Sequence, residues 1–403
     1  MFWRNGSNST SNINDIQCSL FSEAISDRHK KFKSMKKLVV SDTVLKAAWK
    51  RVKTRKETAG VDGLSVRDIE KTGAEEFITQ VSSELKKGKY TPSNVKRIFI
   101  PKASGNLRPI GILTVKDRLV QSALKLILDP IFEADFEDCS FGFRHQLSAR
   151  QATLEVYKWL ELGNEYVLET DIAHCFDCIP HEKLINRIKT RIKDRFVISL
   201  IRSWLKTGIV EHGKTVYPEK GILQGGIISP LLCNIYLDQF DRHFSDFPFK
   251  EKPETTAHLV RYADDLVILS KKPIPLEYIE NLLGNLELEM KKEKTRTVRS
   301  YNGFEFLGCF FKKHSHAGIT WIGMYPGLNS VDRLKEKIEE ITDLRLVTTC
   351  PVEKMMQNVN SAVKGWLNYY LHTFYKKPLV ELESFYSTRI KNYIRVYSYM
   401  HHQ

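Results

Sequence analysis

The sequence has few cysteines and no long apolar segment. Seven cysteines are scattered without even spacing over 403 residues, which predicts reduced thiols rather than a disulfide framework. The longest apolar runs, such as GIISPLLCNIYL, are interrupted by proline and asparagine and fall short of the roughly 20 residues that a membrane helix needs. The N-terminal stretch MFWRNGSNSTSNIND is polar and lacks the apolar core of a secretory signal. We therefore expect a cytoplasmic protein with no membrane span.

Internal repeats and paired metal-binding motifs are also missing. No period of about 20 to 50 residues recurs, which argues against a solenoid or a propeller. Cys175 and Cys178 form a lone C-x-x-C motif, but structural zinc normally needs a second pair of ligands, and none stands at a suitable spacing. A structural zinc site is therefore not expected.

Acidic residues are outnumbered by basic ones. The chain has 62 Lys and Arg against 48 Asp and Glu, a formal net charge of +14. The basic residues gather in RHKKFKSMKK, KRVKTRK and EMKKEKTRTVR. Such a surface attracts polyanions, although charge alone does not distinguish a nucleic-acid partner from a solvated basic face.

The first half of the chain reads as mixed α and β. SDTVLKAAWKRVKTRK predicts a helix capped by Ser41, with an apolar face of Val44, Ala47, Ala48 and Val52. NVKRIFIPKASGNLRPIGIL predicts a β-hairpin with Lys and Arg on both arms. TVKDRLVQSALKLILDPIFE has helical spacing and should end at Pro130. EYVLETDIAHCFDCI should begin as a buried strand that leads into Asp171.

The second half adds a long helix, more strands and a helical end. After GILQGG, Ser229 and Pro230 suit the N-cap and first position of a helix whose apolar face should pack on a sheet. HLVRYADDLVILS predicts two short strands joined at residues 263–265, and YNGFEFLGCFF predicts two more. Beyond about residue 325, three amphipathic patterns predict a separate helical domain.

The segment RYADDLVIL places Asp264 and Asp265 between apolar runs. Two like charges repel strongly in a poorly solvated turn, so a cation should be present unless the turn is an exposed acidic tip. Carboxylate oxygens suit Mg²⁺. Asp171, at the end of the predicted buried strand, could add a third carboxylate, and Asp177 follows six residues later. Carboxylates on neighbouring strands could hold two metal ions for nucleotidyl transfer.

These motifs carry a family resemblance that runs from about residue 47 to residue 370. In chain order they are AGVDGLS, IPKASGNLRPIGILTVKDRLVQSAL, FGFR, TDIAHCFDCIPH, GILQGGIISPLLCNIYLD, RYADDLVIL, EKT and FEFLG. The chain resembles reverse transcriptases of the group II intron type and their bacterial relatives. The resemblance implies an α+β, right-hand polymerase: an N-terminal extension over residues 1–40, fingers mainly over 41–165, a palm with an antiparallel sheet packed on helices mainly over 166–320, and a helical, maturase-like thumb over 321–403.

The resemblance also assigns roles to residues at the matching positions. Asp171, Asp264 and Asp265 would form the catalytic triad, with Asp171 and Asp264 as the principal ligands of two Mg²⁺ ions, or of Mn²⁺ in their place. Asp265 and Ile172 complete the expected metal site. The expected nucleotide-binding residues are Lys102, Arg108, Phe176, Gln224 and Lys294. The expected template and primer contacts are Arg144, Phe306, Leu307 and Gly308.

Each of these assignments has a structural alternative. Lys102 and Arg108 match the finger cations that grip a triphosphate, or belong to a solvated basic ribbon. Phe176 matches the ring that excludes a ribose 2′-hydroxyl, or is a core residue. Gln224 and Lys294 match contacts to the nucleotide and the pyrophosphate, or are a turn glutamine and a surface lysine. In VKGWLNYY, the tryptophan and tyrosines at helical spacing favour core packing over base stacking.

The implied function is RNA-directed DNA synthesis, with an RNA template, dNTPs and a DNA product as partners. No segment resembling the DNA-binding and Cys/His-rich endonuclease regions of full intron-encoded proteins is present before Gln403. We therefore expect a stand-alone bacterial enzyme rather than an autonomous retrohoming one, with antiphage defence using a dedicated noncoding RNA as one such task. The alternatives are a maturase-like RNA-binding protein and protein-primed or template-independent DNA synthesis. The oligomeric state stays open.

Overall fold

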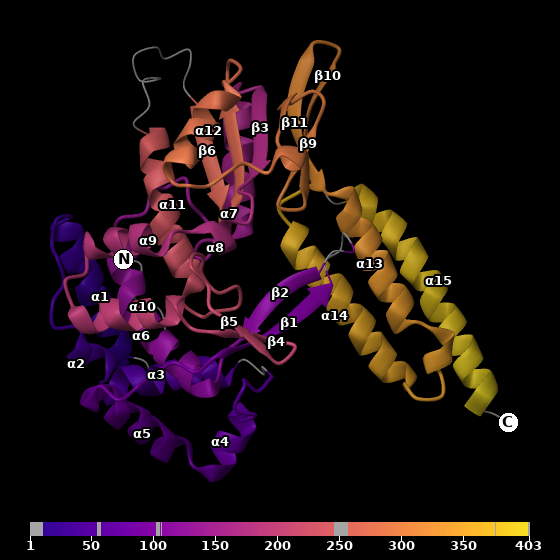
Figure 1. The fold of residues 1–403 in the computed structure, drawn as a ribbon. Coiled ribbons are helices and arrows are strands. Elements are labelled where there is room, and N and C mark those ends of the chain that lie inside the picture. Colours follow the sequence, from indigo (N-terminus) through magenta and orange to yellow (C-terminus); the bar gives the residue numbers. More distant parts are fainter. Residues whose placement is uncertain are drawn as a thin grey trace.

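The computed structural model describes residues 11–54, 58–101, 105, 107–245, 257–374 and 376–401. Helices and three β-sheets combine in these residues, which confirms the predicted α+β fold class. Figure 1 shows a body of helices and sheets from which three long C-terminal helices (orange to yellow) extend. None of the helices in these ranges is both long and apolar enough to cross a membrane.

The N-terminal part of the chain surrounds one buried helix, α6. Its helices are α1 (Ser11–Ser26), α2 (Lys36–Val39), α3 (Asp42–Lys53), α4 (Val66–Thr72), α5 (Ala74–Lys87) and α6 (Val115–Glu133). Helix α6 is buried along most of its length and packs against α1 and α3. The predicted end at Pro130 is wrong, because the helix continues to Glu133. Apolar residues on both sides of the proline are buried, and this packing offsets the backbone hydrogen bond that the proline removes.

Helix α3 forms as its sequence predicts. The Ser41 hydroxyl accepts a hydrogen bond from the N–H of Val44 at 3.4 Å, and so caps the helix. Val44, Ala48 and Val52 are buried, whereas Ala47 is only half-buried. The amphipathic pattern therefore identified part of the core face of this helix and missed Leu45 and Trp49, which are buried as well.

The predicted basic hairpin is the edge of a four-stranded sheet. Strands β1 (Val95–Pro101) and β2 (Leu107–Ile112) are antiparallel, with Ile100 opposite Arg108. Two short strands, β4 (Ile209–Glu211) and β5 (Lys214–Val216), extend this sheet in the order β2-β1-β4-β5. Arg108 is therefore on an edge strand, where it is exposed.

The central sheet is built from strands that are far apart in sequence. Its strands are β3 (Tyr166–Asp171), β6 (Ala257–Tyr262), β7 (Asp265–Ser270) and β8 (Arg296–Arg299), in the order β6-β7-β3-β8, with every pairing antiparallel. Helices around it are α7 (Ala149–Glu161), α8 (Cys175–Cys178), α9 (His181–Lys189), α10 (Arg195–Leu205), α11 (Ser229–Ser245) and α12 (Leu276–Asn285), with a 3₁₀ turn, η3, at Lys292–Lys294.

Both faces of the central sheet are covered, which explains its continuous apolar runs. Leu168 and Ile268 belong to the main core together with residues of α9 and α11. Val167 and Leu269 belong to a second core together with residues of α7. Because neighbouring side chains on a strand point to opposite faces, a sheet buried on both sides needs apolar residues at successive positions. Helix α11 thus shares a core with the sheet, as predicted, although it begins at Ser229 itself.

The C-terminal part contains a small sheet followed by three helices. The strands are β9 (Phe304–Phe306), β10 (Cys309–His316) and β11 (Ile319–Pro326), in the order β11-β10-β9. The helices are α13 (Leu328–Ile341), α14 (Val352–Tyr370) and α15 (Lys376–His401), with a 3₁₀ turn, η4, at Leu344–Leu346. The three predicted helices are confirmed. The predicted start of the helical region at residue 321 falls inside β11, so that boundary moves to residue 328.

Candidate active site

The pairing of β3 with β7 brings the three predicted catalytic carboxylates to one end of the central sheet. Asp171 is the last residue of β3 and lies opposite Asp265, the first residue of β7. The N–H of Ile172 donates to the carbonyl oxygen of Asp264 at 3.1 Å, which holds the β6–β7 turn against the end of β3. Antiparallel register thus places side by side residues that are more than 90 positions apart in the chain.

Burial and mutual repulsion perturb all three carboxyl groups. Burial, together with the Asp171 and Asp264 carboxylates, raises the pKa of Asp265 to about 8. Burial and the charge of Asp171 also raise the pKa of Asp264. Burial alone would raise the pKa of Asp171 as well. Hydrogen bonds from Asp265 and Lys294 have the larger combined effect, so the pKa of Asp171 is lowered. The Asp171–Asp265 pair therefore holds one proton at neutral pH, with the charge mainly on Asp171.

Lys294 supplies the positive charge in this cluster. It ends η3, directly before β8, and its ammonium group forms an ion pair with Asp171. Burial disfavours the charged form of Lys294, but the nearby carboxylates outweigh it and raise its pKa. The backbone supports the contact, because the N–H of Lys291 donates to the carbonyl oxygen of Asp171 at 2.8 Å. The structure thus brings the predicted Lys294 to the carboxylates.

The donor set fits a hard divalent cation. Burial and the neighbouring carboxylates disfavour the charged forms of Asp264 and Asp265 and raise their pKa values. A divalent cation would offset both effects, and carboxylate oxygens are ligands that Mg²⁺ prefers. In the described part of the chain, no group of three or more His, Cys, Asp or Glu side chains is already arranged as a metal cluster. Lys294 and Asp265 engage the Asp171 carboxylate instead. A bound cation would therefore take the place of a proton and an ammonium group.

Asp265 should make the stability of the metal-free protein depend on pH. Its pKa is about 8 in the folded chain and about 4 in an unfolded one. The folded state then holds a proton that the unfolded state has lost, so the free energy of unfolding should fall as the pH rises from about 5 to 8. Asp264 acts in the same direction, whereas the lowered pKa of Asp171 acts only below about pH 4.

Thermal denaturation in EDTA across this pH range measures the effect. The Asp265→Asn variant should show a flatter dependence than the wild type, because it cannot take up the proton. Identical slopes for the two proteins would show that Asp265 titrates normally and that the carboxylates are not coupled.

Arg108 is on β2, and Gln224 is hydrogen-bonded to the same strand. The positive charge of Arg108 acts on Asp264 and opposes the rise of its pKa. Gln224 donates from its side-chain amide to both carboxylate oxygens of Asp177, at 3.3 and 3.2 Å. The backbone carbonyl oxygen of Gln224 accepts a hydrogen bond from the N–H of Gly111 on β2 at 2.7 Å. A cavity of about 310 Å³ is lined by Gln224, Asp177 and Gly111 among others. Lys102 lies outside the described residues.

Phe176 is half-buried on the short helix α8. His174, which precedes this helix, adopts a left-handed conformation with φ of 46°, so the chain turns sharply after β3. The carbonyl oxygen of Phe176 accepts a hydrogen bond from the N–H of Ile222 at 2.6 Å, and the ring packs against the main core. The ring is therefore held on the short helix that follows β3, with part of its surface open to solvent.

The structure does not bring Arg144 to the carboxylates. Its side chain is only 7% exposed and forms an ion pair with Glu133 at 2.9 Å. It also donates to the carbonyl oxygens of Glu137 and Ser140. These bonds engage the guanidinium group within the protein, where it orders the segment between α6 and α7. The expected contact of Arg144 with template stays a prediction.

The three residues of the FLG motif have different environments. Phe306 is buried in the second core, where it packs with other strand residues. Leu307 and Gly308 form the turn to β10 with positive φ angles of 48° and 72°. Their carbonyl oxygens accept hydrogen bonds from the hydroxyl groups of Tyr369 and Tyr370, at 2.9 and 3.0 Å. Helix α14 therefore holds this turn.

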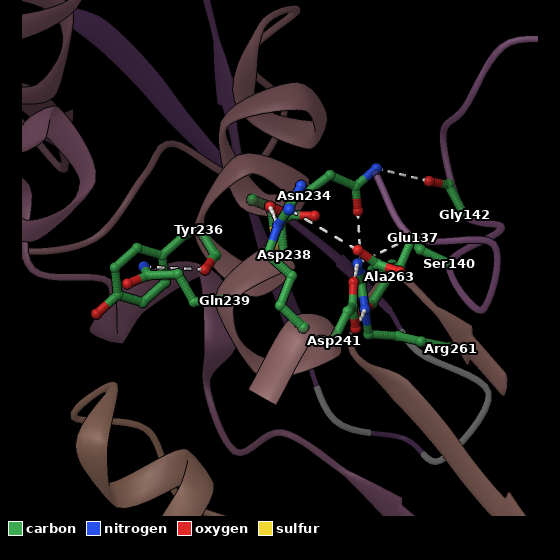
Figure 2. A network of polar contacts seen from close by, with 12 residues as sticks. Glu137, Ser140, Gly142, Asn234, Tyr236, Asp238, Gln239, Asp241, Arg261 and Ala263 are labelled. Atoms are coloured by element: carbon green, nitrogen blue, oxygen red, sulfur yellow. Dashed lines mark hydrogen bonds and ion pairs between the residues drawn. The ribbon is translucent and has the colours of Figure 1, made fainter. Parts of the chain in front are cut away.

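The sequence did not identify four residues around the β6–β7 turn as part of the site: Ser140, Gly142, Asn234 and Arg261. Figure 2 shows them converging behind the turn, together with Asp241. Gly142 belongs to the FGFR motif and Arg261 directly precedes YADD. Their positions in these motifs could therefore have marked them as residues of the site. The contacts that give these residues meaning, however, cross up to 121 positions of sequence.

Comparisons with known proteins agree with this geometry. The family model "Reverse transcriptase (RNA-dependent DNA polymerase)" matches residues 100–311, and "Group II intron, maturase-specific domain" matches residues 331–396. Protein YkfC of Escherichia coli (strain K12) is 28% identical over 85% of this chain and 93% of its own. Group II intron-encoded protein LtrA of Lactococcus lactis subsp. cremoris is 37% identical over 56% of this chain and 38% of LtrA.

A solved structure titled "Partial Cas6-RT-Cas1--Cas2 complex" aligns with a TM-score of 0.39 and 23% identity, over 62% of this chain and 40% of that one. The described structure places three carboxylates at one end of an antiparallel sheet. The chain belongs to the reverse transcriptase family, whose model covers just over half of its 403 residues. Its enzymatic class is RNA-dependent DNA polymerase, and a maturase-specific region follows the polymerase region.

Proposed function

We propose that the chain extends the 3′-hydroxyl of a primer with deoxynucleotides at the site formed by Asp171, Asp264 and Asp265. The observation that carries this proposal is the register of β3 with β7, which sets Asp171 opposite Asp265 in a chain of the reverse transcriptase family. These three carboxylates would hold the Mg²⁺ ions, with the Ile172 backbone beside them. When bound, such ions lower the pKa of the attacking hydroxyl and neutralise charge on the leaving pyrophosphate.

The remaining residues of the site have roles that their positions support. Arg108, exposed on β2 and close enough to influence Asp264, would bind the triphosphate of the incoming nucleotide. Lys294 would leave Asp171 and donate positive charge, or a proton, to the pyrophosphate as it departs. Gln224, held by its backbone bond to β2, would contact the incoming nucleotide.

Phe176 would select deoxyribose over ribose. Phe176 is on α8, the short helix that follows the Asp171 strand, and its ring would exclude the 2′-hydroxyl of a ribose bound beside it. Replacing Phe176 with valine should therefore reduce the preference for dNTPs over rNTPs by about ten- to a hundredfold in kcat/KM, the usual range for one steric contact. Single-nucleotide incorporation with matched dNTP and rNTP pairs measures this ratio. An unchanged ratio in a folded variant would leave Phe176 as a core residue.

We further propose that the template is a specific structured or noncoding RNA. A basic pocket of about 520 Å³ supports binding of a polyanion such as RNA. Its five cationic side chains are Lys31, Lys189, Lys193, Arg195 and Arg202. Within the described ranges, only Arg202 of these pairs with a carboxylate, that of Glu182 at 2.6 Å. Residues of α10 line the pocket. In Figure 1 this helix lies on the opposite side of the molecule from α13–α15.

Purification from the host tests the template proposal. The wild-type protein should retain one abundant RNA and, after addition of Mg²⁺ and dNTPs, make DNA complementary to it. Replacing Lys193 and Arg195 with glutamine should reduce RNA retention and lower the slope of log affinity against log salt by about 0.7 per lost phosphate contact. Activity on a short annealed template and primer should persist. Diverse RNA in both preparations would contradict a dedicated template. A role in antiphage defence that uses this RNA is part of the same proposal.

The same basic pocket favours a second candidate function, that of a maturase-like RNA-binding protein. The match of residues 331–396 to a maturase-specific domain supports it. An Asp264→Ala variant separates the two functions, because it should lose DNA synthesis and keep RNA binding. If that variant retained the full biological function, RNA binding would be the main role and polymerisation secondary.

A further inference from the structure

Arg261 is completely buried, and all five of its guanidinium N–H groups are used. Nε and Nη2 donate to the two carboxylate oxygens of Asp241, and Nη2 also donates to the hydroxyl of Ser140 at 2.7 Å. Nη1 donates to the side-chain oxygen of Asn234 at 3.1 Å and to the carbonyl oxygen of Ala263 at 3.0 Å. Both Arg261 and Asp241 are 0% exposed. Figure 2 shows this network between α11 and the β6–β7 turn.

The network reaches the catalytic turn from two directions. Arg261 holds the turn from within through the Ala263 carbonyl. From outside, the side-chain amide of Asn234 donates to the carbonyl oxygen of Gly142 at 2.8 Å, which fixes the glycine segment. A Cβ atom on Gly142 would lie 2.4 Å from the nitrogen of Ala263, so the glycine backbone is packed directly against the turn. Ala263 is thus enclosed between two anchored groups.

The turn needs such support because its conformation is unfavourable. Ala263 has φ of 58°, in the left-handed region that a residue with a side chain seldom occupies. Strained residues of this kind persist only where their surroundings enforce them, and they gather at functional sites. The next two residues are the carboxylates Asp264 and Asp265, so a change at Ala263 would move both.

Stability alone is a poor explanation for this network. A buried ion pair contributes little net stability, because the loss of hydration offsets most of the attraction, and well-packed apolar residues often replace such a pair without loss. An arginine fork, by contrast, fixes direction as well as distance, because its donors form a rigid plane. The geometry of five bonds from one guanidinium suits a positioning role.

We infer that Arg261 and Asn234 are positioning residues that hold the β6–β7 turn, and with it Asp264 and Asp265, in the arrangement that catalysis requires. The inference rests on the proposed catalytic role of the carboxylates. Arg261 and Asn234 act through the backbone of Ala263 and Gly142.

The test compares two buried arginines. Lysine at position 261 keeps the charge and removes the planar fork. Arg191→Lys is the matched control: Arg191 is also buried, pairs with Asp135 at 3.3 Å and donates to the Ala24 carbonyl at 2.9 Å, with no bond to the turn. Both variants should lose thermal stability. Arg261→Lys alone should lower kcat by about ten- to a hundredfold while the affinity for annealed template and primer stays within about twofold.

Manganese binding gives a readout that does not depend on turnover. Electron paramagnetic resonance of free Mn²⁺ should show weaker binding to Arg261→Lys than to wild type, and unchanged binding to Arg191→Lys. If Arg261→Lys lost activity only in proportion to its unfolded fraction, or kept its Mn²⁺ affinity and kcat, the positioning role would be refuted.

A milder variant keeps the test decisive if Arg261→Lys does not fold. Asn234→Ser leaves the Arg261–Asp241 pair and removes both bonds of the amide. It should fold and lose several-fold in kcat with template affinity retained. An unchanged kcat in folded Asn234→Ser would overturn the inference. If the Asp264→Ala variant were as active as wild type, the proposed function would be refuted instead. Failure of the proposed function can therefore be distinguished from failure of the positioning inference.

Discussion

Replacing Asp264 with alanine is expected to abolish primer extension without destabilising the protein. The carboxylate would supply several kcal/mol of transition-state stabilisation through the cations it holds, and about 1.4 kcal/mol corresponds to a factor of ten in rate. A fall in kcat of roughly a thousandfold or more follows. Burial and the charge of Asp171 raise the pKa of Asp264, so its charged form is unfavourable in the metal-free fold. Its removal should leave the melting temperature in EDTA unchanged or higher.

This combination separates lost chemistry from lost structure. Single-turnover extension of a DNA primer on an RNA template measures kcat, and thermal denaturation in EDTA measures stability. Asp332→Asn, an exposed carboxylate on α13, serves as the control and should retain activity. Activity of Asp264→Ala within about tenfold of wild type would show that the chemistry occurs elsewhere. A large drop in melting temperature would show that Asp264 serves the fold.

Gly142→Ala is expected to reduce kcat by about a hundredfold, although the residue touches no substrate. The new Cβ atom would lie 2.4 Å from the nitrogen of Ala263 and 3.0 Å from the carbonyl carbon of Tyr262. Real Cβ atoms do not approach backbone so closely, so the β6–β7 turn or the glycine segment must shift. A displacement of about 1 Å at reacting groups can reduce the rate a hundredfold. Affinity for template and primer should change little.

The control for Gly142→Ala is Gly365→Ala. Gly365 lies within α14, and a Cβ atom there would meet nothing within 4 Å. Alanine in a helix interior should stabilise the chain by up to about 1 kcal/mol relative to glycine and leave kcat unchanged. If Gly142→Ala folded and extended primers as fast as wild type, the turn would tolerate displacement, and the positioning argument would lose its physical basis.

Local pattern predicted much of the fold and the centre of the site. The hairpin of β1 and β2, the two strands around YADD and the three C-terminal helices all follow from periodicity and turn residues. The sequence predicts that Asp171 meets the YADD pair only if their two strands are neighbours in the sheet. The structure confirms this, because β3 pairs with β7 and Asp171 lies opposite Asp265. Lys294 joins them because η3 ends beside β3.

What the sequence could not predict depends on packing between distant segments. Arg144 carries a charge that suits ligand binding. In the fold, however, its guanidinium group is hydrogen-bonded to Glu133 and to two backbone carbonyl groups. Pro130 has the local chemistry of a helix end, yet the core around α6 carries the helix past it. The role of Arg261 is set by Asp241 and Ser140, which are 20 and 121 positions away. Charge and propensity at one position do not determine which partner folding supplies.

One measurement tests the central claim most directly: anomalous diffraction from crystals of the protein with an RNA template, a DNA primer lacking its 3′-hydroxyl, a matched dNTP and Mn²⁺. Our account predicts manganese peaks bound by carboxylate oxygens of Asp171 and Asp264, with Lys294 displaced from Asp171. Peaks confined to other residues, or no peak beside these carboxylates while the dNTP is bound, would contradict it.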